Sequence, residues 1–221
     1  MKPAIRLGDK EPRFEFWKMV FKDILWKQGL NILLLLLSPI LVPLAVMFRK
    51  TDKWPSHIHK KEYGSWKFYT TRIPFLKVYV GDVGFGGDGT YPNTIPSWIK
   101  VFGMTSIPAN IYWALIRNPV GGYDREFKIG CKLTEDSQIY YYGDARVGDD
   151  GDGAGRQFII TKTPEDTYRG FYKITLLPDN PKKCKRIRAG YKVKTYYTES
   201  YTQPVDATLF SYSTKDYKEP K

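Results

Sequence analysis

Two glycine-rich stretches of the sequence contain residue types that bind ions. The acidic run Asp149–Gly155 supplies part of the alternating oxygen ligands and the sharp turn of a calcium loop, but the distal glutamate that completes such a loop is missing. The run Gly84–Gly89 looks like a phosphate-binding loop, yet no Lys-Ser or Lys-Thr pair follows it. We therefore interpret both stretches as turns and loops, and we predict neither a metal site nor a cofactor.

Residues that carry out nucleophilic or acid–base catalysis are sparse. The chain has 2 histidines and 2 cysteines, and His57 and His59 are far in sequence from Cys131 and Cys184. None of the motifs Gly-x-Ser-x-Gly, His-Glu-x-x-His and Cys-x-x-Cys occurs. We therefore expect a protein without enzymatic activity, and an enzyme with a dispersed site is the remaining alternative.

The densest chemical signal is a basic stretch that is followed by several tyrosines. Basic side chains beside aromatic rings suit single-stranded nucleic acid, and they equally suit the anionic headgroups of a membrane. A solvated strand of a basic protein gives the same pattern. Because the chain also contains an apolar segment, we favour anionic lipid over nucleic acid. The candidate binding residues are Lys182, Lys183, Lys185, Arg186, Arg188, Lys192 and Lys194.

An uncharged run, Leu30–Phe48, is the element that would bring this chain to a membrane. As a helix it would be about 28 Å long, close to the thickness of the hydrocarbon core. Pro39 and Pro43 each remove a backbone hydrogen bond, and Ser38 can satisfy a carbonyl that is freed in this way. The run predicts a single kinked crossing, which we favour, or a re-entrant hairpin that returns to the same side. The residues that mark the segment are Leu30, Leu34, Pro39, Pro43 and Phe48.

The flanks of this run do not fix its orientation. Residues 1–29 carry 7 Lys or Arg and residues 49–68 carry 6, so the asymmetry that the positive-inside rule requires is missing. Upstream, Phe14–Lys27 has apolar residues at helical spacing between lysines, which predicts an amphipathic helix in the headgroup layer. We expect residues 1–65 to form a membrane-associating helical region.

From Trp66 onward, aromatic, β-branched and charged residues alternate, which favours strands. We expect residues 66–210 to form a mostly antiparallel β domain with one helix at Ala109–Arg117, and residues 211–221 to form a flexible polar tail. The predicted fold class is therefore α+β. The expected strands are Trp66–Thr71, Leu76–Val80, Glu126–Leu133, Gln138–Tyr142, Gln157–Thr161, Gly170–Leu176 and Ile187–Tyr197.

One motif resembles that of a known family. The segment Trp113–Asp124 is similar to the Trp-x-x-x-Arg-Asn-Pro-x-x-Gly-aromatic-Asp motif of small uncharacterised tailed-bacteriophage proteins, which also have an N-terminal apolar segment with internal prolines. The resemblance implies a phage origin and a host-membrane setting, without an activity. Because the proline disfavours a helical residue before it, we expect the motif to end a helix rather than to bind a ligand. The motif residues are Trp113, Arg117, Asn118, Pro119, Tyr123 and Asp124.

The net charge of +12 on 221 residues indicates an anionic partner. Residues 1–68 hold 13 basic and 6 acidic residues, so more than half of the basic excess surrounds the apolar run. We therefore expect a non-enzymatic adaptor or inhibitor at the host inner membrane, with its β domain in the cytoplasm. Its expected partners are anionic lipid and an unidentified host or phage protein. The alternative is a membrane-tethered nucleic-acid-binding module.

Overall fold

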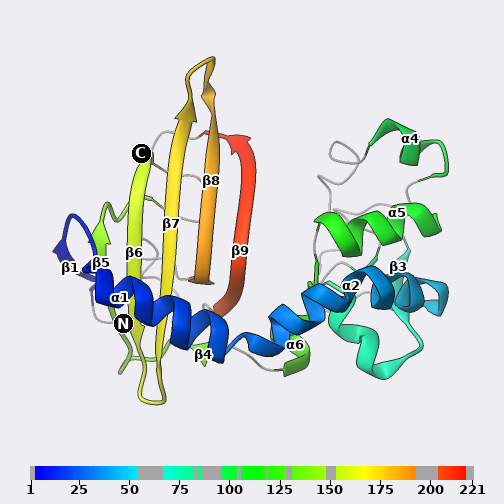
Figure 1. Cartoon of the computed structure of the whole chain (residues 1–221), viewed down its shortest axis with the longest axis horizontal. Coiled ribbons are helices and arrows are strands. Elements are labelled where there is room, and N and C mark those ends of the chain that lie inside the picture. Colours follow the sequence, from blue (N-terminus) through cyan, green and yellow to red (C-terminus); the bar gives the residue numbers. More distant parts are fainter. Residues whose placement is uncertain are drawn as a thin grey trace. The chain divides into compact units, whose positions relative to one another are not determined.

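The computed structural model describes residues 3–53, 67–81, 84–85, 96–103, 106–117, 119–127, 131–147, 153–192 and 204–217 (Figure 1). It combines helices with a mostly antiparallel sheet, which confirms the predicted α+β class. The chain divides into two compact units. Unit 1 contains Met1–Leu30 and Ile129–Lys221, and unit 2 contains Asn31–Lys128. This division differs from the expected boundary at residue 65, because the N-terminal helix packs on strands from the C-terminal part of the chain.

Unit 1 is built on one sheet, whose described strands follow the order β1-β5-β6-β7-β8-β9-β4. Within this order β1 runs parallel to β5, and the other neighbours are antiparallel. The three longest strands, β7, β8 and β9, are neighbours in this order. The strands are β1 (Ile5–Gly8), β4 (Cys131–Lys132), β5 (Gln138–Gly143), β6 (Gly155–Lys162), β7 (Thr167–Leu177), β8 (Asn180–Lys192) and β9 (Pro204–Asp216).

The two faces of this sheet have different partners. The outer face is crossed by the helix α1 (Arg13–Lys18) and its π-helical continuation η1 (Met19–Trp26), shown in blue in Figure 1. This helix packs Met19 against Phe158 of β6. The opposite, inner face buries an apolar cluster. The buried residues of this cluster are Leu133, Ile139, Val147, Ile159, Tyr168, Tyr172, Ile174, Cys184 and Tyr191.

A glycine on β8 lets the helix approach the outer face closely. Gly170 on β7 lies opposite Gly190 on β8, and Gly190 has a φ of 87°, which residues with a side chain rarely adopt. A Cβ atom on Gly190 would lie 2.3 Å from the carbonyl oxygen of Arg169 and 3.2 Å from the sulfur of Met19. Nε2 of Gln28 donates a hydrogen bond of 3.2 Å to the Gly190 carbonyl. A side chain at this position would therefore push against both the sheet and the helix.

Unit 2 is organised around the apolar helix α2 (Gly29–Met47). Two hydrogen bonds connect the shorter elements to it: Tyr79 donates to the Leu34 carbonyl at 2.8 Å, and the N–H of Arg72 donates to the Phe48 carbonyl at 2.9 Å. The other described elements of unit 2 are β2 (Arg49–Asp52), which pairs with β3 (Phe68–Thr71), the 3₁₀ helix η3 (Pro74–Tyr79), α4 (Ser97–Lys100), α5 (Ile107–Tyr112), its π-helical extension η4 (Trp113–Arg117) and α6 (Tyr123–Phe127).

Two of the expected strands are corrected by the structure. The range Leu76–Val80 falls on η3, because Pro74 starts a helical turn in which the N–H of Leu76 donates to the Ile73 carbonyl. The range Glu126–Leu133 begins at the end of α6, and within its described part the strand β4 covers two residues. Alternating apolar residues therefore gave a strand pattern where a proline and a tight turn dictate helical turns.

The strand β9 differs from the flexible tail that was expected from residue 211. It continues through Asp216 and pairs with β8 along most of its length. From residue 211 to residue 216 the strand contains small polar, aromatic and charged residues, as in Ser211-Tyr212-Ser213, and no aliphatic residue, which hid this part of the strand. The end of the expected strand Ile187–Tyr197 lies outside the described residues from Val193 onward.

Replacing Gly190 with alanine is expected to destabilise the protein by about 2–4 kcal/mol, because the new Cβ meets the Arg169 carbonyl in a left-handed backbone conformation. Urea unfolding in neutral detergent measures the loss. Gly29→Ala is the matched control, since a Cβ there has no neighbour within 4 Å and helices favour alanine. Equal stability of the two variants would contradict the role assigned to Gly190.

Candidate functional site

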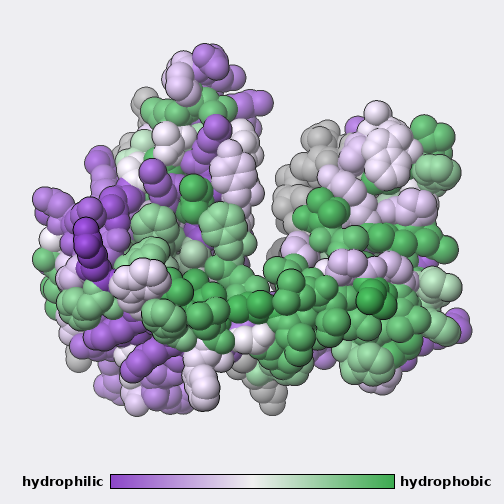
Figure 2. Space-filling model, in the orientation of Figure 1, coloured by the Kyte–Doolittle hydropathy of each residue, from purple (hydrophilic) through white to green (hydrophobic). Residues whose placement is uncertain are grey.

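The helix α2 has one face packed on unit 2 and one face exposed. It is long and apolar enough to cross a membrane by length and composition. Its buried side chains are the small or polar ones, namely Asn31, Ser38, Val42, Ala45 and Val46. Its exposed face is marked by Leu33, Leu36, Leu37, Ile40 and Met47. The face turned away from unit 2 is thus the more hydrophobic one, and Figure 2 shows hydrophobic residues along the side of α2 turned to the viewer.

The residues that marked the predicted membrane segment fall on both sides of α2. The exposed ones are Leu30, Pro39 and Phe48, and the half-buried ones are Leu34 and Pro43. The helix is continuous through both prolines, so the chain does not reverse between Gly29 and Met47. This continuity disfavours the hairpin alternative.

The carbonyl groups near the first proline have partners. Pro39 has no N–H to donate to Leu35 four residues earlier, and the Ser38 hydroxyl donates to that carbonyl at 2.7 Å. This contact confirms the predicted role of Ser38. The hydroxyl of Tyr79 donates to the neighbouring Leu34 carbonyl, and its burial raises the pKa of Tyr79 to about 12. Tyr79 therefore keeps its proton, and this hydrogen bond, throughout the physiological pH range.

The motif Trp113–Asp124 ends one helix of unit 2 and reverses the chain into α6. Val120 adopts a φ of 53° in the turn, and the N–H of Gly122 donates to the Val78 carbonyl at 2.9 Å. These contacts support the expected structural use of the motif. Its described side chains are those of Trp113 and Tyr123, which are buried, and of Pro119, which is exposed. The side chains outside the described part are those of Arg117, Asn118 and Asp124.

The helix formed by α1 and η1 exists where it was predicted, and it carries apolar residues on both sides. A surface helix normally turns its apolar face to the core, and here Met19 is buried on the outer face of the sheet beside the half-buried Phe16 and Ile24, together with the fully buried Asp23. The outward side also exposes large apolar residues, and an exposed apolar surface of this kind is typical of a contact surface. The large apolar residues that point outward are Phe14, Trp17, Phe21, Leu25 and Trp26.

A network of ion pairs fastens the inward side of this helix to the sheet. Arg169 on β7 donates from Nε to Glu15 at 2.8 Å and from Nη1 to Asp23 at 3.1 Å. Nζ of Lys27 lies 3.1 Å from the Asp23 carboxylate and 2.8 Å from Asp166, in the β6–β7 turn. Each of these charges faces at least one opposite charge, which makes its burial tolerable. We call these five residues the ion-pair network.

Burial and pairing act in opposite directions on the network. Burial raises the pKa of Asp23 and outweighs the opposite effect of Lys27 and Arg169. Burial also disfavours the charge on Glu15, but hydrogen bonds from Arg169 and Lys18 prevail and lower the pKa of Glu15 below its ordinary value. For the Arg169 guanidinium, burial is outweighed by its hydrogen bonds to two carboxylates, which raise its pKa. Of the two carboxylates of Asp23 and Glu15, that of Asp23 therefore takes up a proton first as the pH falls.

The basic stretch predicted from the sequence does not form one surface. Alternation along β8 sends Lys183 and Lys185 to the outer face, where both are exposed. It sends Arg186 and Arg188 to the inner face, where Arg186 is buried. The other three residues are Lys182, which is exposed, Lys192, which is half-buried, and Lys194, which lies outside the described residues. The structure thus places Lys183 and Lys185 on the opposite side of the strand from Arg186 and Arg188.

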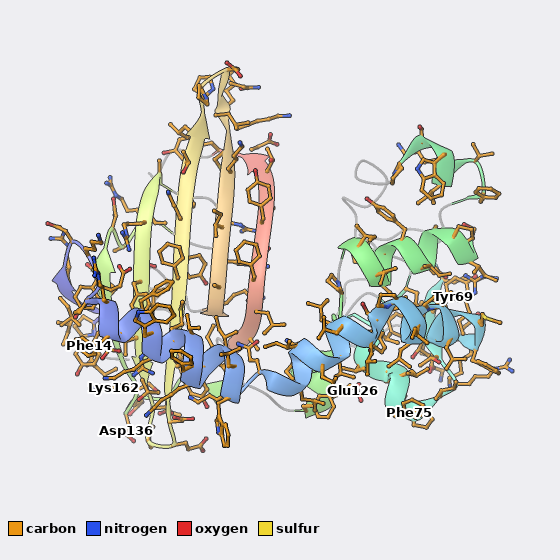
Figure 3. All side chains as sticks on the ribbon, viewed as in Figure 1. Phe14, Tyr69, Phe75, Glu126, Asp136 and Lys162 are labelled. Carbon is orange, nitrogen blue, oxygen red and sulfur yellow. The ribbon has the colours of Figure 1, made fainter. Side chains whose placement is uncertain are left out.

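A cavity of about 370 Å³ lies between α1 and the outer face. Phe14 and Lys162, both labelled in Figure 3, belong to its wall. Three other lining residues are Glu15, Lys18 and Arg169, and the carboxylate of Glu15 pairs with both cations. Within the described ranges, no three side chains of His, Cys, Asp or Glu form a group that could hold a metal ion. We therefore assign no ligand to this cavity.

The ion-pair network was missed at the level of the sequence. Asp23 and Lys27 are four residues apart on one helix, and this spacing is a readable signal of an ion pair. Their shared partner on the sheet is not readable, because Arg169 is 146 residues away from Asp23. The periodicity of a sequence indicates which residues share a face of a helix or strand, but it carries no information on contacts between residues so far apart in the sequence.

A family model described as a family of unknown function (DUF7338) matches residues 25–215. The match extends from the end of η1 into β9. Neither the curated proteins nor the solved structures contain a match to the chain. The family match confirms that the chain is a member of an uncharacterised family, and the phage origin that the motif implies stays a prediction.

Replacing Arg169 with methionine is expected to destabilise the protein by about 3–5 kcal/mol at pH 7, because Asp23 and Glu15 lose their shared cation in a buried site. The loss should shrink as the pH falls. Asp23, with its raised pKa, then takes up a proton above the range of a free aspartate, and the wild type loses the contribution of Glu15 once that group is protonated. Urea unfolding at a series of pH values measures both effects.

The control for this variant is Lys10→Met, which removes an exposed cation of unit 1 and should change stability by less than about 0.5 kcal/mol. A loss for Arg169→Met that stays constant from neutral to acidic pH would contradict the assignment of Asp23 as the proton acceptor.

Proposed function

Since the chain belongs to DUF7338, a family of unknown function, we propose its role from its own geometry. The protein is a membrane-anchored, non-enzymatic adaptor or inhibitor. It attaches to one leaflet through the outward faces of α1–η1 and of α2, and it presents the sheet of unit 1 to a partner protein. The resemblance to tailed-bacteriophage proteins supplies the setting, which is the inner membrane of an infected host cell.

The observation that carries this proposal is the exposed apolar face of the α1–η1 helix. Trp26 is 86% exposed and Phe21 is 58% exposed, while Asp23 between them has no exposed surface. Transfer of such rings out of water is favourable by about 25 cal/mol per Å² of apolar surface. The flanking Lys22, which is exposed, would add about 1 kcal/mol beside anionic headgroups. Aromatic residues and lysines in this arrangement are typical of a helix that lies in the membrane interface.

The packing of α2 supports attachment from one side of the bilayer. A full crossing would carry the irregular backbone of η3, which binds Leu34 through Tyr79, to a depth where exposed backbone groups have no partners. A helix that lies in the plane of the membrane, with Leu36 and Ile40 among the acyl chains, avoids this cost. The similar numbers of basic residues on its two flanks also suit a helix whose ends remain on the same side.

We propose the adaptor or inhibitor role from the surfaces that remain in water when the outward faces of α1–η1 and α2 contact lipid. The inner cluster of unit 1 is a closed apolar core, and the charged groups under α1 are used for packing. We infer that the protein holds this folded surface at the membrane, and its partner would be a host or phage protein.

Placing charges on the outward face of α2 should release the protein from membranes. Leu36 and Ile40 are each 72% exposed, so Leu36→Glu/Ile40→Glu should leave the fold intact while each carboxylate opposes contact with lipid. We expect co-flotation with vesicles of phosphatidylglycerol and phosphatidylethanolamine to fall by about tenfold or more. Thr214→Glu, which places a carboxylate on exposed β9, is the control and should float like the wild type. If the double variant floated as well as the wild type, α2 would not be part of the membrane anchor.

The sidedness of attachment can be read from both ends of the chain. With an epitope tag at each terminus, protease added to inverted inner-membrane vesicles should digest both tags, because a one-sided anchor leaves both ends on the cytoplasmic face. A crossing by α2 would protect one of them. Detergent added before the protease is the control, and it should expose both tags in either case.

A further inference from the structure

The outer face of the unit 1 sheet continues beyond the helix as an open aromatic surface. Strand pairing sets Phe171, Ala189 and Phe210 side by side, and the first two of them pack against the helix. Phe210, on the strand farther out, is 65% exposed, and Tyr212 on the same strand is 55% exposed. Because residues two apart on a strand share a face, both rings project from the outer face into water.

Lysines lie on one side of the two rings. Lys173 and Tyr212 lie in one row on either side of Ile187, and Lys185 follows in the next row toward the β7–β8 hairpin. Lys183 lies one row farther, opposite Asp216. All three lysines are exposed, so three cations and one carboxylate extend the surface from Tyr212 toward this hairpin. We call Lys173, Lys183, Lys185, Phe210 and Tyr212 the open β7–β9 face.

The position of the helix decides which anionic partner can reach this face. The α1–η1 helix packs on the same outer face, and a helix with its side chains is about 10 Å thick. A flat bilayer that touches the outward rings of the helix is therefore held about 10 Å above the neighbouring sheet. A flexible polyanion can enter beside the helix and follow the step down to the sheet, whereas a flat lipid surface would have to bend to do so.

We propose that the open β7–β9 face binds single-stranded nucleic acid. Phe210 and Tyr212 are about 7 Å apart along β9, so each ring offers a separate platform for an unstacked base. Lys173 lies two strands from Tyr212 in the same row, and Lys185 and Lys183 continue toward the β7–β8 hairpin, so the phosphates of such a chain would pass on that side of the rings. Stacking and charge together tolerate many base sequences, so the surface is a general binder of single strands.

This inference does not rest on the membrane role. The rings on the open face are different residues from the rings on the outward side of the helix, and α2 belongs to the other unit. Loss of either activity by substitution should therefore leave the other intact.

Fluorescence anisotropy of the full chain in neutral detergent tests the proposal, with fluorescein-labelled 12-nucleotide oligo(dT) or oligo(U) as the probe. We expect Phe210→Ala/Tyr212→Ala to weaken binding by about tenfold or more. Lys173→Gln/Lys185→Gln should also weaken binding, and it should reduce the slope of log affinity against log salt by about 1.4. Urea midpoints of both variants should match that of the wild type, since the substituted side chains are exposed.

The matched controls come from unit 2. Phe75, labelled in Figure 3, is an exposed ring and Lys100 is an exposed lysine, so Phe75→Ala and Lys100→Gln should keep the affinity of the wild type. Equal affinity of the wild type and both double variants would overturn the proposal, as would a wild type that binds no oligonucleotide at low salt. If the ring variant instead lost co-flotation with anionic vesicles and the wild type bound no oligonucleotide, the face would be a lipid contact and the proposal would be wrong.

Discussion

The buried carboxylate of Asp23 is the constraint on which the arrangement of unit 1 depends. A charge without exposed surface is tolerated only beside opposite charges, and here these come from Lys27 on the helix and Arg169 on the sheet. Pairing with Arg169 and the packing of Met19 on Phe158 turn one side of the helix toward the sheet, and the opposite side, with Trp26, faces outward. The surface that we propose as a membrane anchor is thus a consequence of ionic pairing and apolar packing together.

The elements that could be predicted from the sequence are those whose own residues carry a complete pattern. The uncharged run became α2, and the alternating residues around Tyr140 and Ile159 became β5 and β6. Elements that depend on their neighbours were missed. The strand β1 consists of four residues, which is too short for a pattern. The end of β9 contains the sequence Ser-Tyr-Ser, and its place in the sheet is set by pairing with β8.

The residue types of the candidate surfaces could be predicted from the sequence, but the faces on which these residues lie could not. A run of basic residues predicts an anionic partner wherever they point, but strand alternation sends Arg186 to the inner face and Lys185 to the outer one. The aromatic partners of the exposed lysines, Phe210 and Tyr212, come from a strand that the sequence did not reveal. The orientation of the amphipathic helix could not be predicted either, because it is decided by residues on the sheet.

The exposed rings of the α1–η1 helix also affect the solubility of the protein before it contacts a membrane. A newly made molecule that has folded in water displays Trp17, Phe21 and Trp26 to the solvent, and surfaces of this kind adhere to one another. Under the membrane attachment that we propose, the supply of lipid area would limit how much of the protein a cell can hold in dispersed form. Synthesis that outpaced this supply would convert the excess into aggregates or into substrate for proteases.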